Sequence, residues 1–260
     1  MYEIIDTHAH LEEIAGLEQV VAGAEASGLT AIIAVGSDII SNTRTLEIAG
    51  KYPDFVYPAL GYHPWNIKES EIETNLSFIR ENIDRAVAVG EVGLDYHKHV
   101  RANADKDLQK RVLGELLKIA KEHAKPTCIH SRYAWRDAFD AIKGAGLAKA
   151  VFHWYTGTSS VLRDILDSGY YISVTPAIAY HEEHRRAVKE TPLSQLLLET
   201  DSPVTYARGR EGEFEARPVD VLRSLRGSTV LKGISEERIA QATTENAKRL
   251  FGIGKIHYGI

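Results

Sequence analysis

Short hydrophobic runs alternate along the chain with segments whose hydrophobic residues recur at helical spacing. The runs are rich in Val, Ile, Leu and Tyr and have the length of buried strands. They predict eight strands, over residues 3–6, 31–35, 55–60, 86–89, 126–129, 150–152, 170–174 and 195–198. The most regular helical pattern covers residues 107–123, with one face formed by Leu108, Val112, Leu113, Leu116, Leu117 and Ala120. Repeated strand, helix, strand units indicate a parallel sheet.

The same alternation fits an open doubly wound sheet and a closed barrel, and the polar residues favour the barrel. A chemically reactive side chain directly follows almost every run: His8 and His10, His63, Glu91, His130, His153 and Asp201. The carboxyl ends of all eight strands of a barrel meet at one rim, whereas an open sheet keeps its outer strands apart. We therefore predict an α/β fold, a single (β/α)8 TIM barrel that forms one domain over residues 1–260.

Composition and charge narrow the class of protein. The content of 44% hydrophobic and 26% charged residues suits a globular protein with a sizeable core. A formal net charge of -5 argues against a protein that coats nucleic acid non-specifically, although it allows a local basic pocket. The single cysteine, Cys128, excludes an intramolecular disulfide, and we expect it to be an inert core residue. Because there is no leader or long apolar run, we expect a cytoplasmic protein that does not bind membranes and needs no obligate protein partner.

The first candidate ligands are two histidines at the end of the first run. His8 and His10 lie two residues apart, and residues two apart on a strand point to the same side, so both imidazoles can converge on one ion. Taken alone, a His-x-His pair is more often unrelated to metal binding. Glu91 follows the fourth run, and its two carboxylate oxygens could bridge two cations. Taken alone, Glu91 is more simply a helix-capping or salt-bridged residue.

Three further candidates follow later runs. His130 and His153 each end an apolar run, at equivalent points of consecutive strand–helix units, so a shared purpose is favoured over two unrelated core histidines. Asp201 follows the eighth run, where an aspartate can bind a metal and accept a proton from an attacking water. Glu199, two residues earlier, could instead pair with a cation inside the barrel.

Together these residues supply four imidazoles and two carboxylates. This mixed set suits Zn, Mn, Co or Fe, or Mg if the carboxylates dominate. We expect two divalent metal ions, with open coordination positions for water and substrate. One ion is assigned to His8, His10, Glu91 and Asp201, and the other to Glu91, His130 and His153.

Other polar segments are given structural interpretations. His181 and His184 are three residues apart, which is the wrong spacing for a zinc-protease helix, so we interpret them as a solvated helix start. The polar loop over residues 205–217 follows the last strand, where barrels often bind phosphate. Ser235 is expected to cap a closing helix.

The chain resembles the TatD family of metal-dependent hydrolases, often described as TatD-type deoxyribonucleases. The resemblance runs nearly from end to end and depends on several motifs in order, which is far more specific than any one of them. The motifs are Asp6-Thr7-His8-Ala9-His10-Leu11, Gly61-Tyr62-His63-Pro64, Gly90-Glu91-Val92-Gly93-Leu94-Asp95, Ile129-His130-Ser131-Arg132, Phe152-His153, Glu199-Thr200-Asp201-Ser202-Pro203 and Asn246-Ala247-Lys248-Arg249-Leu250-Phe251.

The resemblance implies a barrel of the amidohydrolase type, a pair of divalent metals and His63 facing a substrate phosphate. It also implies that Glu91 replaces the bridging carboxylated lysine of other branches of that superfamily. The chain departs from the family in two places. It reads His153-Trp154-Tyr155-Thr156-Gly157 where His-Cys-Phe-Ser-Gly is common, and Ala216-Arg217-Pro218 where Asn-Glu-Pro is common. We expect both departures to touch the substrate rim.

The leading hypothesis is hydrolysis of a phosphodiester, with DNA or another phosphodiester bound at the barrel mouth. Asp201 and Glu91 are the predicted catalytic residues, and Asp201 accepts the proton of the attacking water. The predicted phosphate contacts are His63, Arg132 and Arg208 or Arg210. The predicted base-stacking residues are Trp65, Trp154 and Tyr155.

Two alternatives remain at this point. The same metals could serve an ester or amide hydrolase, including one that deacylates an aminoacyl-tRNA, because metal-activated water attacks carbonyls by the same logic. A catalytically silent metal-binding or nucleic-acid-binding protein is disfavoured by the intact Asp201.

Overall fold

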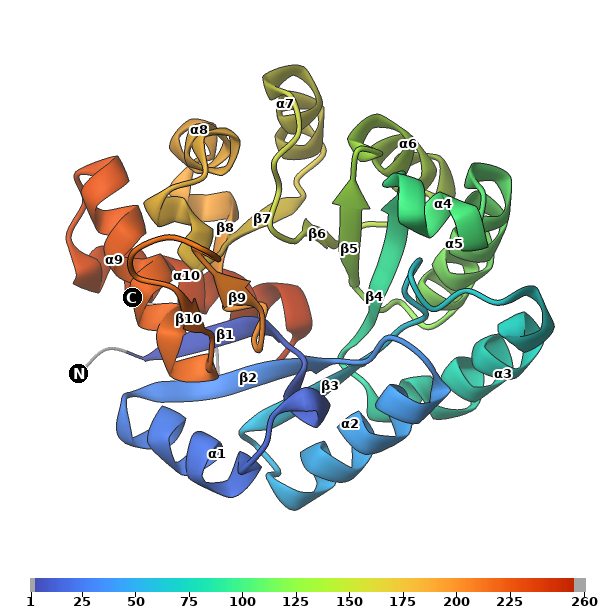
Figure 1. Cartoon of the computed structure of the whole chain (residues 1–260), viewed down its shortest axis with the longest axis horizontal. Coiled ribbons are helices and arrows are strands. Elements are labelled where there is room, and N and C mark those ends of the chain that lie inside the picture. The colour runs from blue at the N-terminus through green and yellow to red at the C-terminus, as the bar shows by residue number, and fades with distance from the viewer. Residues whose placement is uncertain (1–2, 255–260) are drawn as a thin grey trace.

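A computed structural model describes residues 3–254 and contains one eight-stranded parallel sheet. The strands pair in chain order from β1 to β8, lie in the middle of the molecule and are surrounded by helices (Figure 1). Their bounds are β1 (Ile4–Ala9), β2 (Leu29–Val35), β3 (Val56–Leu60), β4 (Ala88–Asp95), β5 (Thr127–Arg132), β6 (Ala150–Phe152), β7 (Tyr171–Val174) and β8 (Leu196–Leu198). The predicted (β/α)8 barrel and its eight strands are confirmed.

Three strands extend further at their carboxyl ends than predicted. β1, β4 and β5 continue past the ends of their hydrophobic runs, so His8, Glu91 and His130 lie within strands and do not follow them. The ladder between β4 and β5 continues through these polar positions, for example where Gly93 pairs with His130. A hydrophobic run marks only the part of a strand whose side chains face other apolar groups, and these strands end among polar ones.

The helices follow the strands in the expected order. The α-helices are α1 (Leu17–Ala26), α2 (Ile39–Lys51), α3 (Ile72–Asn82), α4 (Lys98–Asn103), α5 (Lys106–Glu122), α6 (Trp135–Ala145), α7 (Ser159–Asp167), α8 (Glu182–Glu190), α9 (Val221–Lys232) and α10 (Glu236–Phe251). The 3-10 turns are η1 (Leu11–Glu13), η2 (Glu69–Glu71), η3 (Ile83–Arg85), η4 (Pro176–Ala179), η5 (Leu193–Gln195) and η6 (Pro218–Asp220). The predicted helix over 107–123 is α5, and Ser235 caps α10 by accepting from the backbone N–H of Arg238. The loop over 205–217 contains a two-stranded hairpin, β9 (Thr205–Tyr206) and β10 (Phe214–Glu215).

The core has two apolar layers, because successive side chains of a strand point to opposite faces. On β2, Ile32 packs outward in the cluster that the helices cover, whereas Ile33 belongs to a cluster inside the barrel. Cys128 lies in the inner cluster and is fully buried, as predicted, and burial raises the pKa of its thiol. Phe251 of α10 joins the same cluster, so the last helix closes the end of the barrel at which the strands begin.

Hydrogen bonds between β1 and the segment after β8 close the barrel. The carboxylate of Asp6 is fully buried and accepts from the backbone N–H of Thr200 at 2.9 Å and from its hydroxyl at 2.5 Å. The backbone N–H of Asp201 donates to the carbonyl of His8 at 2.9 Å, and that of His10 donates to the carbonyl of Ser202 at 2.8 Å. Closure therefore places Asp201 beside the two histidines of the first strand.

The domain predicted over residues 1–260 extends beyond the described residues by two positions at one end and six at the other, and its single-domain organisation stays a prediction. Within residues 3–254, no helix is long and apolar enough to cross a membrane.

The prediction that His181 and His184 form a solvated helix start is correct for His181 and wrong for His184. His181 does cap α8, by accepting from the backbone N–H of His184 at 3.4 Å. The side chain of His184, however, is fully buried. Its Nδ1 donates to the carbonyl of Tyr155 at 3.1 Å, and its Nε2 accepts from the backbone N–H of Thr175 at 3.2 Å. These partners lie on other elements, so the local sequence gave no sign of them.

We predict that His184 makes stability fall in mild acid. Burial lowers its pKa from 6.5 to about 4, so between these values the unfolded chain binds a proton that the folded protein excludes. The contribution of His184 to the free energy of unfolding is therefore fully present above pH 6.5. It falls by about 3 kcal/mol as the pH falls to 4. Urea unfolding of wild type and His184→Gln at pH 7 and pH 4 measures this. The wild type should lose about 3 kcal/mol more than the variant, and equal losses would show that the buried imidazole is not responsible.

Candidate active site at the barrel mouth

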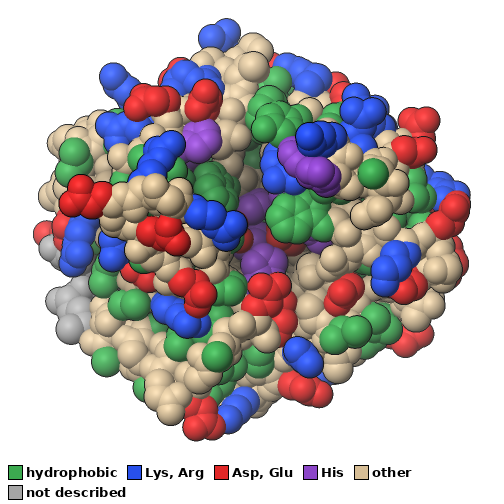
Figure 2. Space-filling view, viewed as in Figure 1, with side chains coloured by type: hydrophobic (Ala, Val, Ile, Leu, Met, Phe, Trp, Pro, Cys, Tyr) green, Lys and Arg blue, Asp and Glu red, His purple; other side chains and the backbone are tan. Residues whose placement is uncertain are grey.

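A pocket of about 840 Å³ opens at the carboxyl ends of the strands. Figure 2 shows histidine side chains at the bottom of this central hollow, with hydrophobic and basic side chains around its mouth. Its lining contains most of the predicted site residues: His10, His63, Glu91, His130, Arg132, His153, Trp154, Asp201 and Arg208. His8 lies beneath them and is fully buried. The fold thus brings all the predicted ligands to one end of the barrel.

Glu91 lies at the centre of this cluster, and its side chain is only 4% exposed. Its Oε1 faces Nε2 of His153 at 2.8 Å and Nδ1 of His130 at 2.9 Å. Its Oε2 faces Nε2 of His8 at 3.3 Å and Nε2 of His10 at 3.4 Å. Each oxygen of one carboxylate therefore faces a different pair of predicted ligands, and Nε2 of His63 also lies 3.4 Å from Oε1.

Asp201 reaches the same cluster from the segment after β8, whereas His8 and His10 come from β1 and the residue after it. Its Oδ1 lies 3.7 Å from Nε2 of His8 and 3.6 Å from Nε2 of His10, the pair that faces Oε2 of Glu91. Burial raises the pKa of the Asp201 carboxyl, although the nearby imidazoles oppose this. His8, Asp201 and His153 also form a close group, so the two sides of Glu91 are contiguous.

The donor set fits divalent metal ions. Nε2 of His8 is buried and has no hydrogen-bond partner within residues 3–254, yet it faces carboxylate oxygens of Glu91 and Asp201. An unpaired buried polar atom is costly unless a proton or cation lies between the groups. Burial disfavours the charged form of His153, but Glu91 and Glu199 outweigh burial and raise its pKa well above the usual value. The cluster therefore attracts positive charge.

Buried carboxylates lie behind three of the imidazoles. Oδ2 of Asp95 lies 3.0 Å from Nε2 of His130, on the side of the ring away from Glu91. Oε1 of Glu199 lies 3.7 Å from Nδ1 of His153, and Oε1 of Glu12 lies 3.8 Å from Nδ1 of His10. Carboxylates in this position orient metal-binding imidazoles and fix their tautomer.

The roles of Asp95 and Glu12 were not predicted from the sequence, and Glu199 was predicted to pair with a cation inside the barrel. Asp95 could have been found, because it lies four residues after Glu91 and residues at even spacing on a strand share a face. That inference requires β4 to extend to Asp95, which the hydrophobic run did not indicate. Glu12 lies in the 3-10 turn after β1, where strand periodicity no longer applies.

His63 differs from the other imidazoles because its Nδ1 accepts from the backbone N–H of Trp65 at 3.1 Å. Burial lowers the pKa of His63 to about 4, so the ring is neutral and its one proton lies on Nε2. That N–H faces Oε1 of Glu91 at 3.4 Å. A ring nitrogen that carries a proton donates hydrogen bonds and does not bind a cation.

Some of the residues that were predicted at the rim of the pocket lie there, and others do not. Trp154 and Arg208 line the pocket, as expected. Tyr155 was wrongly predicted to stack a base: its ring is fully buried and its hydroxyl donates to the carbonyl of Thr158 at 2.9 Å. The departure at Ala216-Arg217-Pro218 was also expected at the rim, but Ala216 is buried and Arg217 pairs with Glu215.

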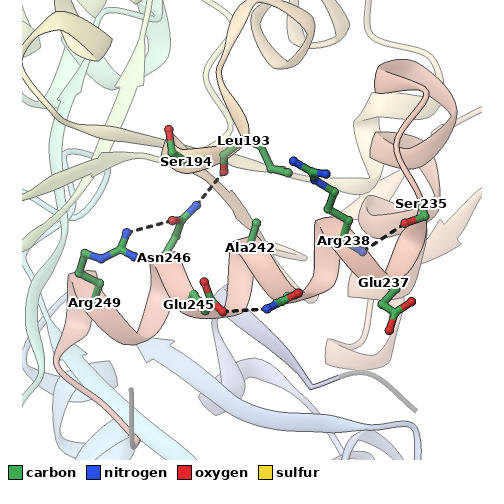
Figure 3. Close-up of a pocket in the computed structure, with 10 residues that line it drawn as sticks. Leu193, Ser194, Ser235, Glu237, Arg238, Ala242, Glu245, Asn246 and Arg249 are labelled. Carbon is green, nitrogen blue, oxygen red and sulfur yellow. Dashed lines mark hydrogen bonds between the residues drawn. The ribbon is translucent and has the colours of Figure 1, made fainter. Parts of the chain in front are cut away.

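A second cavity, of about 570 Å³, lies at the other end of the barrel, where η5 precedes β8 and packs on α10. Its polar groups bind one another (Figure 3). Asn246 donates to the carbonyls of Leu193 and Leu196, and Arg249 donates to Asn246. These contacts hold α10 against the start of β8, so we attribute them to folding.

Comparison with known proteins identifies related metal-dependent hydrolases. The TatD related DNase family model matches residues 5–252. The uncharacterized metal-dependent hydrolase YabD of Bacillus subtilis is 36% identical, with 96% of this chain and 99% of YabD covered. The deoxyribonuclease TATDN3 of Homo sapiens is 30% identical, with 95% of this chain and 94% of TATDN3 covered. The crystal structure of YJJV, a TatD homologue from Escherichia coli, superposes with a TM-score of 0.87 at 29% identity, covering 96% of this chain and 98% of YJJV.

The family model spans almost the whole described chain, and the relatives match over nearly their full lengths. The chain therefore belongs to the TatD family of metal-dependent hydrolases.

Proposed function

We propose that this protein is a deoxyribonuclease that hydrolyses phosphodiester bonds with the help of two divalent metal ions. The observation that carries the proposal is the position of Glu91, whose two oxygens face two separate pairs of imidazoles. A carboxylate with a pair of imidazoles at each oxygen would suit two divalent cations, which two-metal phosphodiesterases use to stabilise the attacking and leaving oxygens. The printed description of TATDN3 as a deoxyribonuclease supports DNA as the substrate.

Six side chains would hold the metals. His8 and His10, with Asp201, would bind the ion at Oε2 of Glu91, and His130 and His153 would bind the ion at Oε1. The mixed nitrogen and oxygen donors suit Zn, Mn or Mg. Bound divalent ions would supply the activation of water for attack on phosphorus at neutral pH.

Asp201 would accept the proton of the attacking water at Oδ2, the carboxylate oxygen that would not bind the ion. It is buried at the edge of the pocket, next to His8 and His10, where a carboxylate can both orient a water molecule and receive its proton. Glu91 is surrounded by five imidazoles and would keep its charge. Burial would raise the pKa of Glu91, but the imidazoles outweigh burial and hold the pKa well below its usual range.

The phosphate would be held by neutral and charged donors that line the pocket. His63 would donate from Nε2, the nitrogen that carries its proton. Arg132 lines the pocket and uses its Nε to contact Asp95, so its terminal nitrogens would be left for the phosphate. Arg208, on the exposed loop after β9, would add a third donor. A cytoplasmic location and action without an obligate protein partner stay predictions from the sequence.

A substrate panel tests the reaction class. Protein prepared without added metal is supplied with Zn, Mn or Mg and assayed on single-stranded DNA, on a phosphodiester dye and on aminoacyl esters. We expect hydrolysis of the DNA and the dye, with aminoacyl esters near background, because the wall of the pocket offers donors for phosphate oxygens. Turnover of the esters without turnover of DNA would contradict the proposed function.

The substitution Asp201→Asn tests the proton acceptor. The amide keeps the shape of the side chain but cannot take a proton, so kcat on DNA should fall by about 10²- to 10⁴-fold. Circular dichroism and the thermal midpoint should show that the fold is retained. The matched control is Asp167→Asn, an exposed position at the end of α7, which should have wild-type kcat. Wild-type kcat in Asp201→Asn would rule out the proposed role.

A further inference from the structure

The tryptophans of the chain are concentrated at the pocket. The sequence has three tryptophans, Trp65, Trp135 and Trp154, and all of them line it. Tyr133 is a fourth large aromatic residue in the same lining. Trp65 and Tyr133 are among the few large hydrophobic side chains of the described chain that are more than half exposed, at 55% and 61%. Exposed aromatic rings gathered at one cavity indicate a binding surface.

Tyr133 occupies an unusual backbone conformation. It follows the last residue of β5 and has a φ of 58°, in the left-handed region that bulky residues rarely adopt. Its ring lies edge to face with Trp135 at 6.0 Å and is stacked near His97 at 6.2 Å between centroids. Backbone strain of this kind tends to persist at ligand-binding positions. Here it holds an aromatic ring in solvent beside the pocket.

Trp65 is fixed relative to the candidate metal centre by Asp95. The indole Nε1 donates to Oδ2 of Asp95 at 2.6 Å, and the same oxygen lies 3.0 Å from Nε2 of His130. Nε of Arg132 lies 2.9 Å from that oxygen, and the guanidinium lies over the indole ring, 5.2 Å from its centroid. One fully buried carboxylate therefore positions an aromatic face, a cation and a candidate metal ligand together.

We propose that Trp65, Arg132 and Tyr133 form a nucleobase subsite beside the metal centre, which rests on the proposed function. An unpaired base stacks on the exposed aromatic rings, while Arg132 contacts the adjoining phosphate. Stacking suits this wall because every base has an aromatic face, and a cation next to the rings strengthens the contact. Asp95 is the positioning residue, since it sets the distance between the subsite and His130.

Binding without turnover tests the subsite. A labelled oligothymidylate is compared with an abasic sugar-phosphate chain of the same length, by fluorescence anisotropy in the presence of EDTA. The wild type should bind the oligothymidylate more tightly by roughly 5- to 150-fold, the contribution of base–aromatic stacking. Tyr133→Asn should reduce this ratio by about fivefold or more, because asparagine tolerates the left-handed backbone but has no ring. Tyr133→Phe keeps the ring and should keep the ratio.

The control variant is Val230→Ala on α9, another exposed hydrophobic residue, at 82% exposure and outside the pocket lining. It should bind both chains as the wild type does. Equal affinity of the wild type for both chains, or an unchanged ratio in Tyr133→Asn, would overturn the subsite. Hydrolysis of DNA is measured in a separate assay, after the divalent metal has been restored. Base-dependent binding without cleavage of any phosphodiester would contradict the deoxyribonuclease proposal while supporting the subsite.

Discussion

The hydrogen bonds that join β1 to the end of β8 and the segment after it connect residues that are 191 to 194 positions apart in the chain. They close the barrel, and they also bring Asp201 within 4 Å of His8 and His10. If this sheet were open, with the same strand order, β1 and β8 would be its opposite edges. Asp201 would then lie far from the two imidazoles. The candidate site therefore depends on closure, which the buried carboxylate of Asp6 stabilises by accepting twice from Thr200.

Around this closure the molecule is organised in shells centred on Glu91. Imidazoles surround its carboxylate, and further carboxylates lie behind three of those imidazoles. Asp95 extends the arrangement outward, because it also binds Trp65 and Arg132 at the pocket wall. Burial raises the pKa of an isolated carboxyl, but hydrogen bonds from His130 and Trp65 outweigh burial at Asp95 and hold its pKa below the usual range. Asp95 thus stays charged and can hold three side-chain donors at once.

The strands and the residue cluster were predicted well from the sequence. Hydrophobic runs indicate strands that are buried against apolar neighbours, and a closed barrel brings the carboxyl ends of these strands together. The prediction failed where a polar residue is buried by partners from distant segments. β4 and β5 continue through Glu91 and His130, which no run of apolar residues could show. His184 was expected in solvent, yet it is buried between Tyr155 and Thr175. The burial of Tyr155 was missed because a Trp-Tyr pair in a loop does not reveal which ring faces the cavity.

The central claim is that two cations bind on either side of one carboxylate. Anomalous diffraction from a crystal grown with Mn²⁺ measures this directly. The account predicts two peaks, one beside Oε2 of Glu91 near His8, His10 and Asp201, and the other beside Oε1 near His130 and His153. A crystal with Mn²⁺ bound elsewhere, for example at the more exposed group formed by His10, Glu12 and Glu13, and none beside Glu91, would contradict it.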